Sequence, residues 1–388
     1  MTRAAIVGWG HTKFGRHDAL GLEDLIVAAS REALADAGLA ADHIDAVWLG
    51  HYNGGLIADG FASSMVHAAD PALRFKRATR CENACASGSS ALYAAMDAID
   101  SGRVRAALVV GAEKMTALDT AGVTRALAGA GYQAEESGLS FPQVFARYAR
   151  AYAKAYGDPG EGMARIAVKN HANALRNPLA QMHRPIDLDF AMTVSDRNPM
   201  IASPLKLSDC SLVSDGAAAV VLVHEDMVPQ FRRAVGFRAA AQVNDLLPLS
   251  AKRLVEFEGP RRAFAQAYAQ AGVGVRDIDF AEVHDCFTIA ELLTMEAMGL
   301  AGPGKASKAL AEGATEREGR LPINLSGGLK AKGHPIGATG VSMHVMAARL
   351  LTGEAGEMTL AKRPELGLCF NMGGGAVTSC VSILEQIK

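Results

Sequence analysis

One unit of helix, turn and strand occurs twice in the chain, and this repeat constrains the fold more than any other feature. Ala35-Asp36-Ala37-Gly38 with Ile44-Asp45 aligns without gaps with Ala269-Gln270-Ala271-Gly272 and Ile278-Asp279, 234 residues further on. In both copies an apolar-faced helix ends at glycine, which adopts the left-handed backbone of a helix C-terminus more readily than other residues. Turn residues of this kind also recur by chance, but we interpret the two segments as a duplication.

Each copy continues in the same way. A short apolar strand comes first, then a small-residue loop that leads into an apolar helix, and then a further strand. The paired segments are Ala46–Leu49 and Phe280–Val283, Cys85–Ile99 and Gly337–Leu351, and Ala106–Val110 and Gly367–Phe370. Apolar strands that alternate with helices are typical of sheets buried under helices. The sequence therefore predicts two similar α/β halves, each with a mostly parallel sheet.

Between the halves, residues 115–208 break the pattern. The turn Gly157-Asp158-Pro159-Gly160 separates helices expected at Phe145–Tyr156 and Met163–Ala174. The mixed polar composition predicts a lid subdomain on the surface, in which His171 and His183 are surface or structural residues. Residues 1–114 and 209–232 then form the N-terminal half, and residues 233–388 form the C-terminal half.

Composition and charge exclude several functions. The 388 residues are 49% hydrophobic, which is ample for a large core, and a net charge of −2 argues against a nucleic-acid or anionic-membrane binder. No apolar run approaches the roughly 18 residues that span a bilayer, and the first residues lead into a strand instead of a signal peptide. Six cysteines without framework spacing predict reduced thiols and a cytoplasmic protein.

Cys85 is the candidate nucleophile. It lies in Asn83-Ala84-Cys85-Ala86-Ser87-Gly88-Ser89-Ser90, where small residues precede a helical run from Ala91 to Ile99. Unpaired N–H groups and the positive end of the helix dipole stabilise a thiolate at such a position. A buried structural cysteine is the alternative interpretation. Cys81, four residues earlier, gives only a poor zinc pattern.

A second group of reactive side chains lies in Phe280-Ala281-Glu282-Val283-His284-Asp285-Cys286-Phe287. The first half of this segment predicts a strand, and Thr288–Met298 predicts the helix after it. His284, Asp285 and Cys286 therefore fall at the C-terminal end of a strand, where α/β folds place their chemistry. Because adjacent residues on a strand point to opposite faces, a metal site is not favoured. Cys286 is instead expected to be a second, acid/base thiol.

The third group is a glycine-dense loop, Asn324 to Gly340, with His334 near its end and a helix expected at Val341–Leu351. Glycine lets backbone approach a ligand closely, and Pro335 holds the backbone of His334 extended. A histidine fixed in this way can act as a general base or as a hydrogen-bond donor to an oxyanion. A structural turn with an incidental histidine is the alternative.

Taken in this order and at these spacings, Cys85, the His284-Asp285-Cys286-Phe287 box and the Gly333-His334-Pro335 box resemble the thiolase superfamily. The resemblance is closest to sterol-carrier-protein-type thiolases and bacterial acetyl-CoA acetyltransferase-like enzymes. It extends from Ala4 to about Leu384 and includes Gly111-Ala112-Glu113-Lys114-Met115 and Ser214-Asp215-Gly216-Ala217-Ala218.

This resemblance implies an α/β thiolase fold with layers in the order αβαβα and an inserted lid. It implies an acyltransferase of lipid metabolism that uses acyl-CoA and coenzyme A as substrates, with no permanently bound cofactor and no metal. It also implies a homodimer or a dimer of dimers. Cys85 carries the acyl group, His334 activates Cys85, His284 holds an enolate oxygen, and the N–H groups of Cys85 and Gly373 form a second oxyanion site.

One position departs from the pattern of many thiolases, which carry an acid/base cysteine in a Cys-x-Gly box near the C-terminus. Here Asn371-Met372-Gly373 stands in that place, and asparagine does not titrate near neutrality. Sterol-carrier-protein-type thiolases use the cysteine of the His-Asp-Cys-Phe box, which is Cys286 here. Cys369 is expected in the core, and Cys210 and Cys380 are interpreted as apolar fillers.

Three other interpretations stay open. A decarboxylating ketosynthase shares this fold but uses histidine or asparagine, so Cys286 argues against it. A thiolase-like subunit that acts only with a small zinc-ribbon/OB-fold partner is compatible with every motif. A degenerate carrier without chemistry is disfavoured, because Cys85, His284, Cys286 and His334 are all present.

Overall fold

The computed structural model describes residues 2–388, and its main feature is one nine-stranded sheet in the order β3-β2-β4-β7-β1-β8-β11-β10-β9. The strands are β1 Ala4–His11, β2 Ala46–Gly50, β3 Arg77–Cys81, β4 Ala106–Glu113, β7 Gly216–His224, β8 Val235–Asn244, β9 Phe280–Val283, β10 Leu366–Gly373 and β11 Thr378–Gln386. β1 and β8 join the two halves in the middle through a short antiparallel pairing.

The two halves of the sheet mirror one another about that junction. On each side, two antiparallel pairings come first, β1/β7/β4 and β8/β11/β10, and a parallel pairing follows, β4/β2 and β10/β9. The outer strand β3 has no full counterpart among the described residues of the second half, where an isolated parallel bridge between Ala281 and Ile323 takes its place beside β9. This mirrored order is what a duplicated unit produces, and the strong antiparallel component differs from the mostly parallel sheet that we expected.

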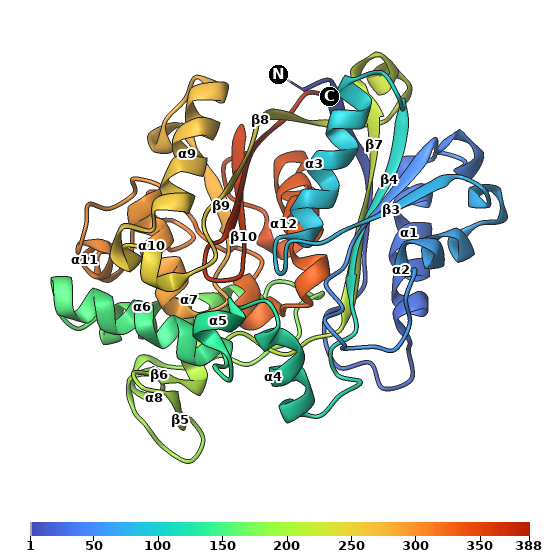
Figure 1. Cartoon of the computed structure of the whole chain (residues 1–388). Coiled ribbons are helices and arrows are strands. Elements are labelled where there is room, and N and C mark those ends of the chain that lie inside the picture. Colours follow the sequence, from blue (N-terminus) through green and yellow to red (C-terminus); the bar gives the residue numbers. More distant parts are fainter. Residues whose placement is uncertain (1) are drawn as a thin grey trace.

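Four long helices complete the layers (Figure 1). α1 (Leu22–Ala37) packs on the outer face of β1 and β7, and α9 (Glu258–Ala271) packs on β8 and β11. α3 (Ser87–Asp100) and α12 (Ile336–Thr352) lie together between the two halves of the sheet. The arrangement is therefore the layered α/β fold that the sequence predicted. The repeated glycines Gly38 and Gly272 both end their helices in the left-handed conformation, with φ of 65° and 67°.

The crossing of α3 and α12 depends on glycine. A Cβ atom on Gly88 would lie 2.8 Å from the carbonyl oxygen of Gly337, and one on Gly340 would lie 2.3 Å from the backbone nitrogen of Ser89. Only helices without these side chains can approach so closely. The close crossing brings the first turns of both helices together, and with them the loops that precede these turns.

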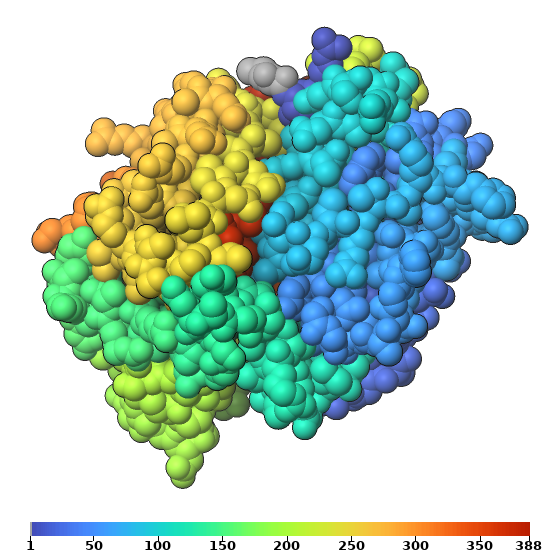
Figure 2. All heavy atoms as spheres, viewed as in Figure 1, coloured from blue at the N-terminus to red at the C-terminus, as the bar shows by residue number. Residues whose placement is uncertain are grey.

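The inserted segment contains α4 (Thr120–Ala128), α5 (Gln133–Glu136), α6 (Phe141–Tyr156), α7 (Gly160–Ala174), α8 (Leu188–Met192), β5 (Met200–Ala202) and β6 (Leu205–Lys206). The other helices are α2 (Ala62–Met65), α10 (Thr288–Ala297) and α11 (Ala306–Ala311). In Figure 2 the green inserted segment forms the lower part of the molecule, and a small area of red C-terminal residues shows between the yellow and the blue parts.

One expectation for this segment was wrong. The sequence predicted a surface lid, but α7 is largely buried and packs against α10, α11 and the turn Gly328–Lys332. The polar side chains of its second half, from Lys169 to Asn173, do not face water. Lys169 pairs with the buried carboxylate of Glu291 at 2.6 Å, and Asn170 donates to the same carboxylate. Polarity here reflects buried pairing instead of exposure.

Candidate active site

Three predicted side chains meet at the starts of α3 and α12. Cys85 lies in the loop before α3, His334 in the loop before α12, and His284 directly after β9. The sulfur of Cys85 and one ring nitrogen from each histidine all lie within 4.8 Å of one another. The two imidazole rings are nearly perpendicular, with centroids 5.1 Å apart. Side chains distant in sequence thus share one small volume, and the prediction that this chain binds no metal stays a prediction.

A cavity of about 360 Å³ opens onto this cluster. Cys85, Cys286 and His334 line it. The rest of its wall is mostly apolar and comes largely from the inserted segment, with Val123, Leu127, Phe141, Phe145, Ile201 and Leu207. Phe145 also stacks on Phe287, with ring centroids 4.6 Å apart. The inserted segment therefore does cover the candidate site, although α7 is buried.

His334 is held in a single orientation. Its backbone N–H donates to the Oγ of Ser214 at 3.0 Å, and its ring Nδ1 lies 2.8 Å from the Oγ1 of Thr339. The Thr339 hydroxyl donates its own proton to the carbonyl of Pro335, so it accepts from a protonated Nδ1 of His334. Nε2 then carries a lone pair. Burial, with Lys332 second, lowers the pKa of His334 to about 3, so the ring is neutral and its free nitrogen can accept a proton.

His284 is buried beside it. Its Nδ1 lies 3.0 Å from the Nδ2 of Asn371 and 3.4 Å from the backbone N–H of Met372. Burial, with the neighbouring His334 second, lowers the pKa of His284 well below its usual range. Like His334, this histidine is uncharged at neutral pH.

Cys85 does not have the thiolate that its position predicted. It lies two residues before the first turn of α3, but burial and the carboxylate of Glu113 raise the pKa of its thiol to about 12. The backbone N–H groups of Gly374 and of Cys85 itself oppose this increase without overcoming it. The expectation failed because desolvation outweighs the helix dipole at this buried site. Cys85 is a thiol until a base removes its proton.

Cys286 lines the same cavity and is almost fully buried. Burial, with Cys85 and Asp285 as further causes, raises the pKa of its thiol well above the usual range. We expected neighbours to tune this thiol towards neutrality, and in the free protein they do the opposite. A protonated Cys286 is suited to donate a proton first and to accept one afterwards.

Gly373 was predicted to supply a backbone N–H to an oxyanion site. It ends β10, and a Cβ atom there would lie 2.1 Å from the carbonyl oxygen of Asn83. The next residue, Gly374, lines the cavity and directs its N–H at the Cys85 thiol. The structure thus adds Gly374, while the role of Gly373 stays a prediction.

Asp285 anchors the loop that carries His284 and Cys286. Its two carboxylate oxygens accept from the backbone N–H groups of Leu329 and Lys330 and from the side chain of Asn170. Burial raises its pKa to about 7, and the nearby carboxylate of Glu291 contributes. Asp285 points away from the cluster, so it connects the His-Asp-Cys-Phe box to the glycine-rich loop.

Several contributing residues were missed from the sequence. Thr339 contacts His334 from the first turn of the following helix, and Gly374 meets Cys85 only in the folded chain. Asn371 was noted solely for the cysteine it replaces. Cys210, interpreted as a filler, lines the cavity, and the backbone N–H of the following Ser211 donates to the carbonyl of Cys286. At the site, the partners of Gly374, Asn371 and Cys210 are distant in sequence, and only Thr339 has its partner nearby, five residues before it at His334.

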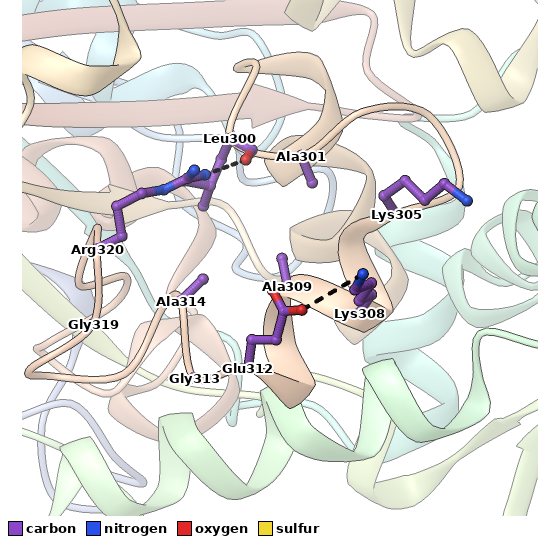
Figure 3. Close-up of a pocket in the computed structure, with 10 residues that line it drawn as sticks. All are labelled: Leu300, Ala301, Lys305, Lys308, Ala309, Glu312, Gly313, Ala314, Gly319 and Arg320. Atoms are coloured by element: carbon purple, nitrogen blue, oxygen red, sulfur yellow. Dashed lines mark hydrogen bonds and ion pairs between the residues drawn. The ribbon is translucent and has the colours of Figure 1, made fainter.

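A second cavity, of about 500 Å³, lies at α11 and the loops on either side of it and holds none of the predicted residues (Figure 3). Its charged side chains are partly satisfied by neighbours in its own wall. Lys308 pairs with Glu312 at 3.7 Å, and Arg320 donates to the carbonyl of Leu300. Without a cysteine or a histidine among its lining residues, this surface hollow does not compete with the Cys85 cavity as the candidate site.

Comparisons with known proteins agree over the whole chain. Residues 4–226 match the family described as "Thiolase, N-terminal domain", and residues 241–386 match "Thiolase C-terminal domain-like". The chain is 36% identical to "Acetyl-CoA acetyltransferase" of Methanothermobacter thermautotrophicus, with 100% of both chains covered. It is 32% identical to "Sterol carrier protein 2" of Homo sapiens, over 97% of this chain and 71% of the relative.

A solved structure shows the same likeness in three dimensions. The structure titled "Ltp2-ChsH2(DUF35) aldolase" superposes with a TM-score of 0.85 at 26% sequence identity, and the match covers 99% of this chain and 98% of that one.

Proposed function

The chain belongs to the thiolase family, and from this membership we propose that it is a CoA-dependent acyltransferase that makes or cleaves a 3-ketoacyl-CoA through an acyl-enzyme on Cys85. The observation that carries the proposal is the approach of Cys85, His284 and His334 to within 4.8 Å at an apolar cavity. The relatives named acetyl-CoA acetyltransferase support the same reaction class.

The first half-reaction transfers an acyl group to Cys85. Nε2 of His334 removes the thiol proton as sulfur attacks the thioester carbonyl, because the high pKa of Cys85 leaves no standing thiolate. The N–H groups of Cys85 and of Gly373 or Gly374 stabilise the oxyanion that forms. The bond from carbon to the CoA sulfur then breaks, and the Cys286 thiol donates its proton to the departing CoA thiolate.

The second half-reaction uses the thiolate left on Cys286. It removes the α-proton of a second acyl-CoA, and His284 together with the protonated His334 holds the enolate oxygen. The enolate carbon attacks the acyl group on Cys85, and the carbon–sulfur bond of the acyl-enzyme breaks. Cys85 regains its proton from His334, so the protein returns to its starting state. Cleavage of a 3-ketoacyl-CoA follows the same steps in reverse.

The test is to incubate the protein with acetyl-CoA and to map the acylated peptide by mass spectrometry. We expect one acyl group on Cys85 and none in Cys85→Ser, which should also lose turnover. Acylation of another cysteine, or undiminished turnover in Cys85→Ser, would contradict the proposal. Cys210→Ser is the matched control, since it also lines the cavity but has no role in this chemistry.

A subunit that acts only with a partner is the second candidate, because the solved neighbour is a complex that its title describes with a DUF35 component. Turnover of acyl-CoA by the isolated chain would exclude that requirement. Absence of turnover, together with normal acylation of Cys85, would favour it.

Homodimer formation is supported by an uncovered edge. β3 pairs with β2 on one side only, and Phe75, just before it, exposes 87% of its surface. An open strand edge beside exposed aromatic rings is suited to pair with a second copy. Light scattering distinguishes the dimer from a monomer of 40.6 kDa.

Among residues 2–388, the structure has no helix with both the length and the apolar character that membrane crossing requires. We propose a cytoplasmic location and a role in lipid metabolism, which six free cysteines and the acyl-CoA chemistry support. Cell fractionation tests the location.

A further inference from the structure

Asn371 occupies the place where many thiolases carry a second cysteine, and it contacts both parts of the candidate site. It is buried on β10. Its Nδ2 lies 3.0 Å from the carbonyl oxygen of Cys85 and 3.0 Å from Nδ1 of His284. On the other side, its Oδ1 accepts from the hydroxyl of Ser89, on the first turn of α3, at 2.9 Å.

These contacts fix the orientation of the amide. The carbonyl of Cys85 can only accept a hydrogen bond, so the atom of Asn371 that faces it must be the NH₂ group. A reversed amide would place two acceptor oxygens against each other, whereas the hydroxyl of Ser89 can bond either end of the amide. The same NH₂ group therefore faces His284, and Nδ1 of His284 must be an acceptor. The backbone N–H of Met372 points at this nitrogen too.

We propose that Asn371 is a positioning residue that fixes His284 as the neutral tautomer protonated at Nε2, so that this histidine donates a hydrogen bond to the thioester or enolate oxygen. The inference rests on the proposed function for its catalytic consequence, but not for the tautomer itself. It gives the two histidines complementary roles. Thr339 leaves a lone pair on Nε2 of His334, whereas Asn371 leaves a proton on Nε2 of His284.

Within residues 2–388, the hydrogen-bond partners of Nδ1 of His284 are two donors, the side-chain amide of Asn371 and the backbone N–H of Met372. The Cys85 thiol before α3 and the His334 ring before α12 each have one atom within 4.8 Å of a ring nitrogen of His284. On its own loop, Asp285 binds the backbone of Leu329 and Lys330 and Cys286 lines the cavity. On β9, Glu282 binds Ser326 and lies 3.9 Å from Lys332. Of the two donors at Nδ1, Asn371 at 3.0 Å makes the shorter contact and Met372 at 3.4 Å the longer one, so the tautomer depends chiefly on Asn371.

The variant Asn371→Asp reverses the polarity of this contact. A carboxylate accepts from Nδ1, so neutral His284 becomes the Nδ1-protonated tautomer and presents a lone pair to the substrate oxygen. Loss of one oxyanion donor costs about 10²- to 10³-fold in kcat. The carboxylate also raises the pKa of His284. Below that raised pKa the imidazolium carries a proton on both nitrogens, so the rate of this variant should recover as pH falls.

The experiment combines ¹⁵N NMR of histidine-labelled protein with pH–rate profiles on acyl-CoA. His284→Gln assigns the resonances of His284 among the 11 histidines. In the native protein we expect Nε2 protonated and Nδ1 unprotonated at every pH from about 5 to 9. In Asn371→Asp we expect Nδ1 protonated, with a loss of rate that shrinks towards acid pH. Asn371→Leu removes the donor without adding an acceptor and should lose less.

Asn83→Asp is the matched control. It introduces the same charge into the loop before α3, but its side chain contacts Ser90 and Thr378 instead of a histidine. It should leave the His284 tautomer unchanged and show no recovery at acid pH. An Nδ1-protonated His284 in the native protein, or a pH-independent loss in Asn371→Asp, would overturn the proposal. If the native chain turns over no acyl-CoA but His284 is protonated at Nε2, the proposed function fails and the tautomer assignment stands.

Discussion

At the scale of single residues, the proposed nucleophile Cys85 is protonated at rest. Cys85 sits where a helix dipole favours a thiolate, yet burial and Glu113 raise its pKa to about 12. A resting thiol is less reactive than a thiolate, which protects the site from side reactions. In the proposed mechanism His334 therefore has to remove the proton from Cys85. Burial lowers the pKa of both His284 and His334, so both rings are neutral at rest. A neutral His334 can accept the thiol proton, and a neutral His284 can donate a hydrogen bond to the substrate oxygen.

The pH dependence of alkylation tests this state. Iodoacetamide reacts with thiolates, so the rate for Cys85 should be low at pH 7 and should still rise with pH above about 9, where a free cysteine of pKa about 8.5 levels off. Because the pKa is raised, the reactive form appears only on the alkaline side. Mass spectrometry identifies the alkylated Cys85 peptide, because this modification is missing in Cys85→Ser. A rate that reaches its plateau below about pH 8.5 would show a standing thiolate instead.

At the scale of elements, α7 supports the site from beneath. Lys169 is buried and bonds both Glu291 on α10, at 2.6 Å, and the carbonyl of Ile323, at 2.9 Å. Asn170, one residue on, bonds Glu291 and Asp285 together. The helix thus connects the inserted segment to the loop that carries His284 and Cys286.

Lys169→Met should therefore destabilise the protein strongly, by about 3–5 kcal/mol, because it leaves the carboxylate of Glu291 buried without its cation. Denaturant unfolding measures the free energy of unfolding. Arg165→Met is the matched control on the same helix, since Arg165 pairs with Glu161 near the surface, and its loss should cost no more than about 0.5 kcal/mol. Equal effects of the two substitutions would show that the buried pair contributes nothing special.

At the scale of the whole molecule, local signals account for what the sequence predicted. The glycines that end α1 and α9 and the apolar periodicity of their helices marked the duplication, because both depend on neighbouring residues alone. The burial of α7 was missed because the partners of Lys169 and Asn170, in α10, in the loop after β9 and at Ile323, are distant in sequence. The contacts of Gly374 and Asn371 and the high pKa of Cys85 were missed for the same reason. They arise near the crossing of α3 and α12, where Asn371 and Gly374 reach Cys85 from more than 280 residues away in the sequence.

Division of the site between the two halves gives the most direct test of the account. Cys85 comes from the first half and Cys286 from the second, and each is assigned one half-reaction.

In Cys286→Ala, acylation of Cys85 by acyl-CoA should persist, although more slowly if proton donation to CoA limits it. Exchange of the α-proton of the second substrate with solvent should fall by about two to four orders of magnitude, and carbon–carbon bond formation should stop with it. The measurement is deuterium exchange into acetyl-CoA, followed beside acyl-enzyme formation on the same variant. Retained acylation with lost exchange is the predicted result, and full α-proton exchange in Cys286→Ala would contradict the account.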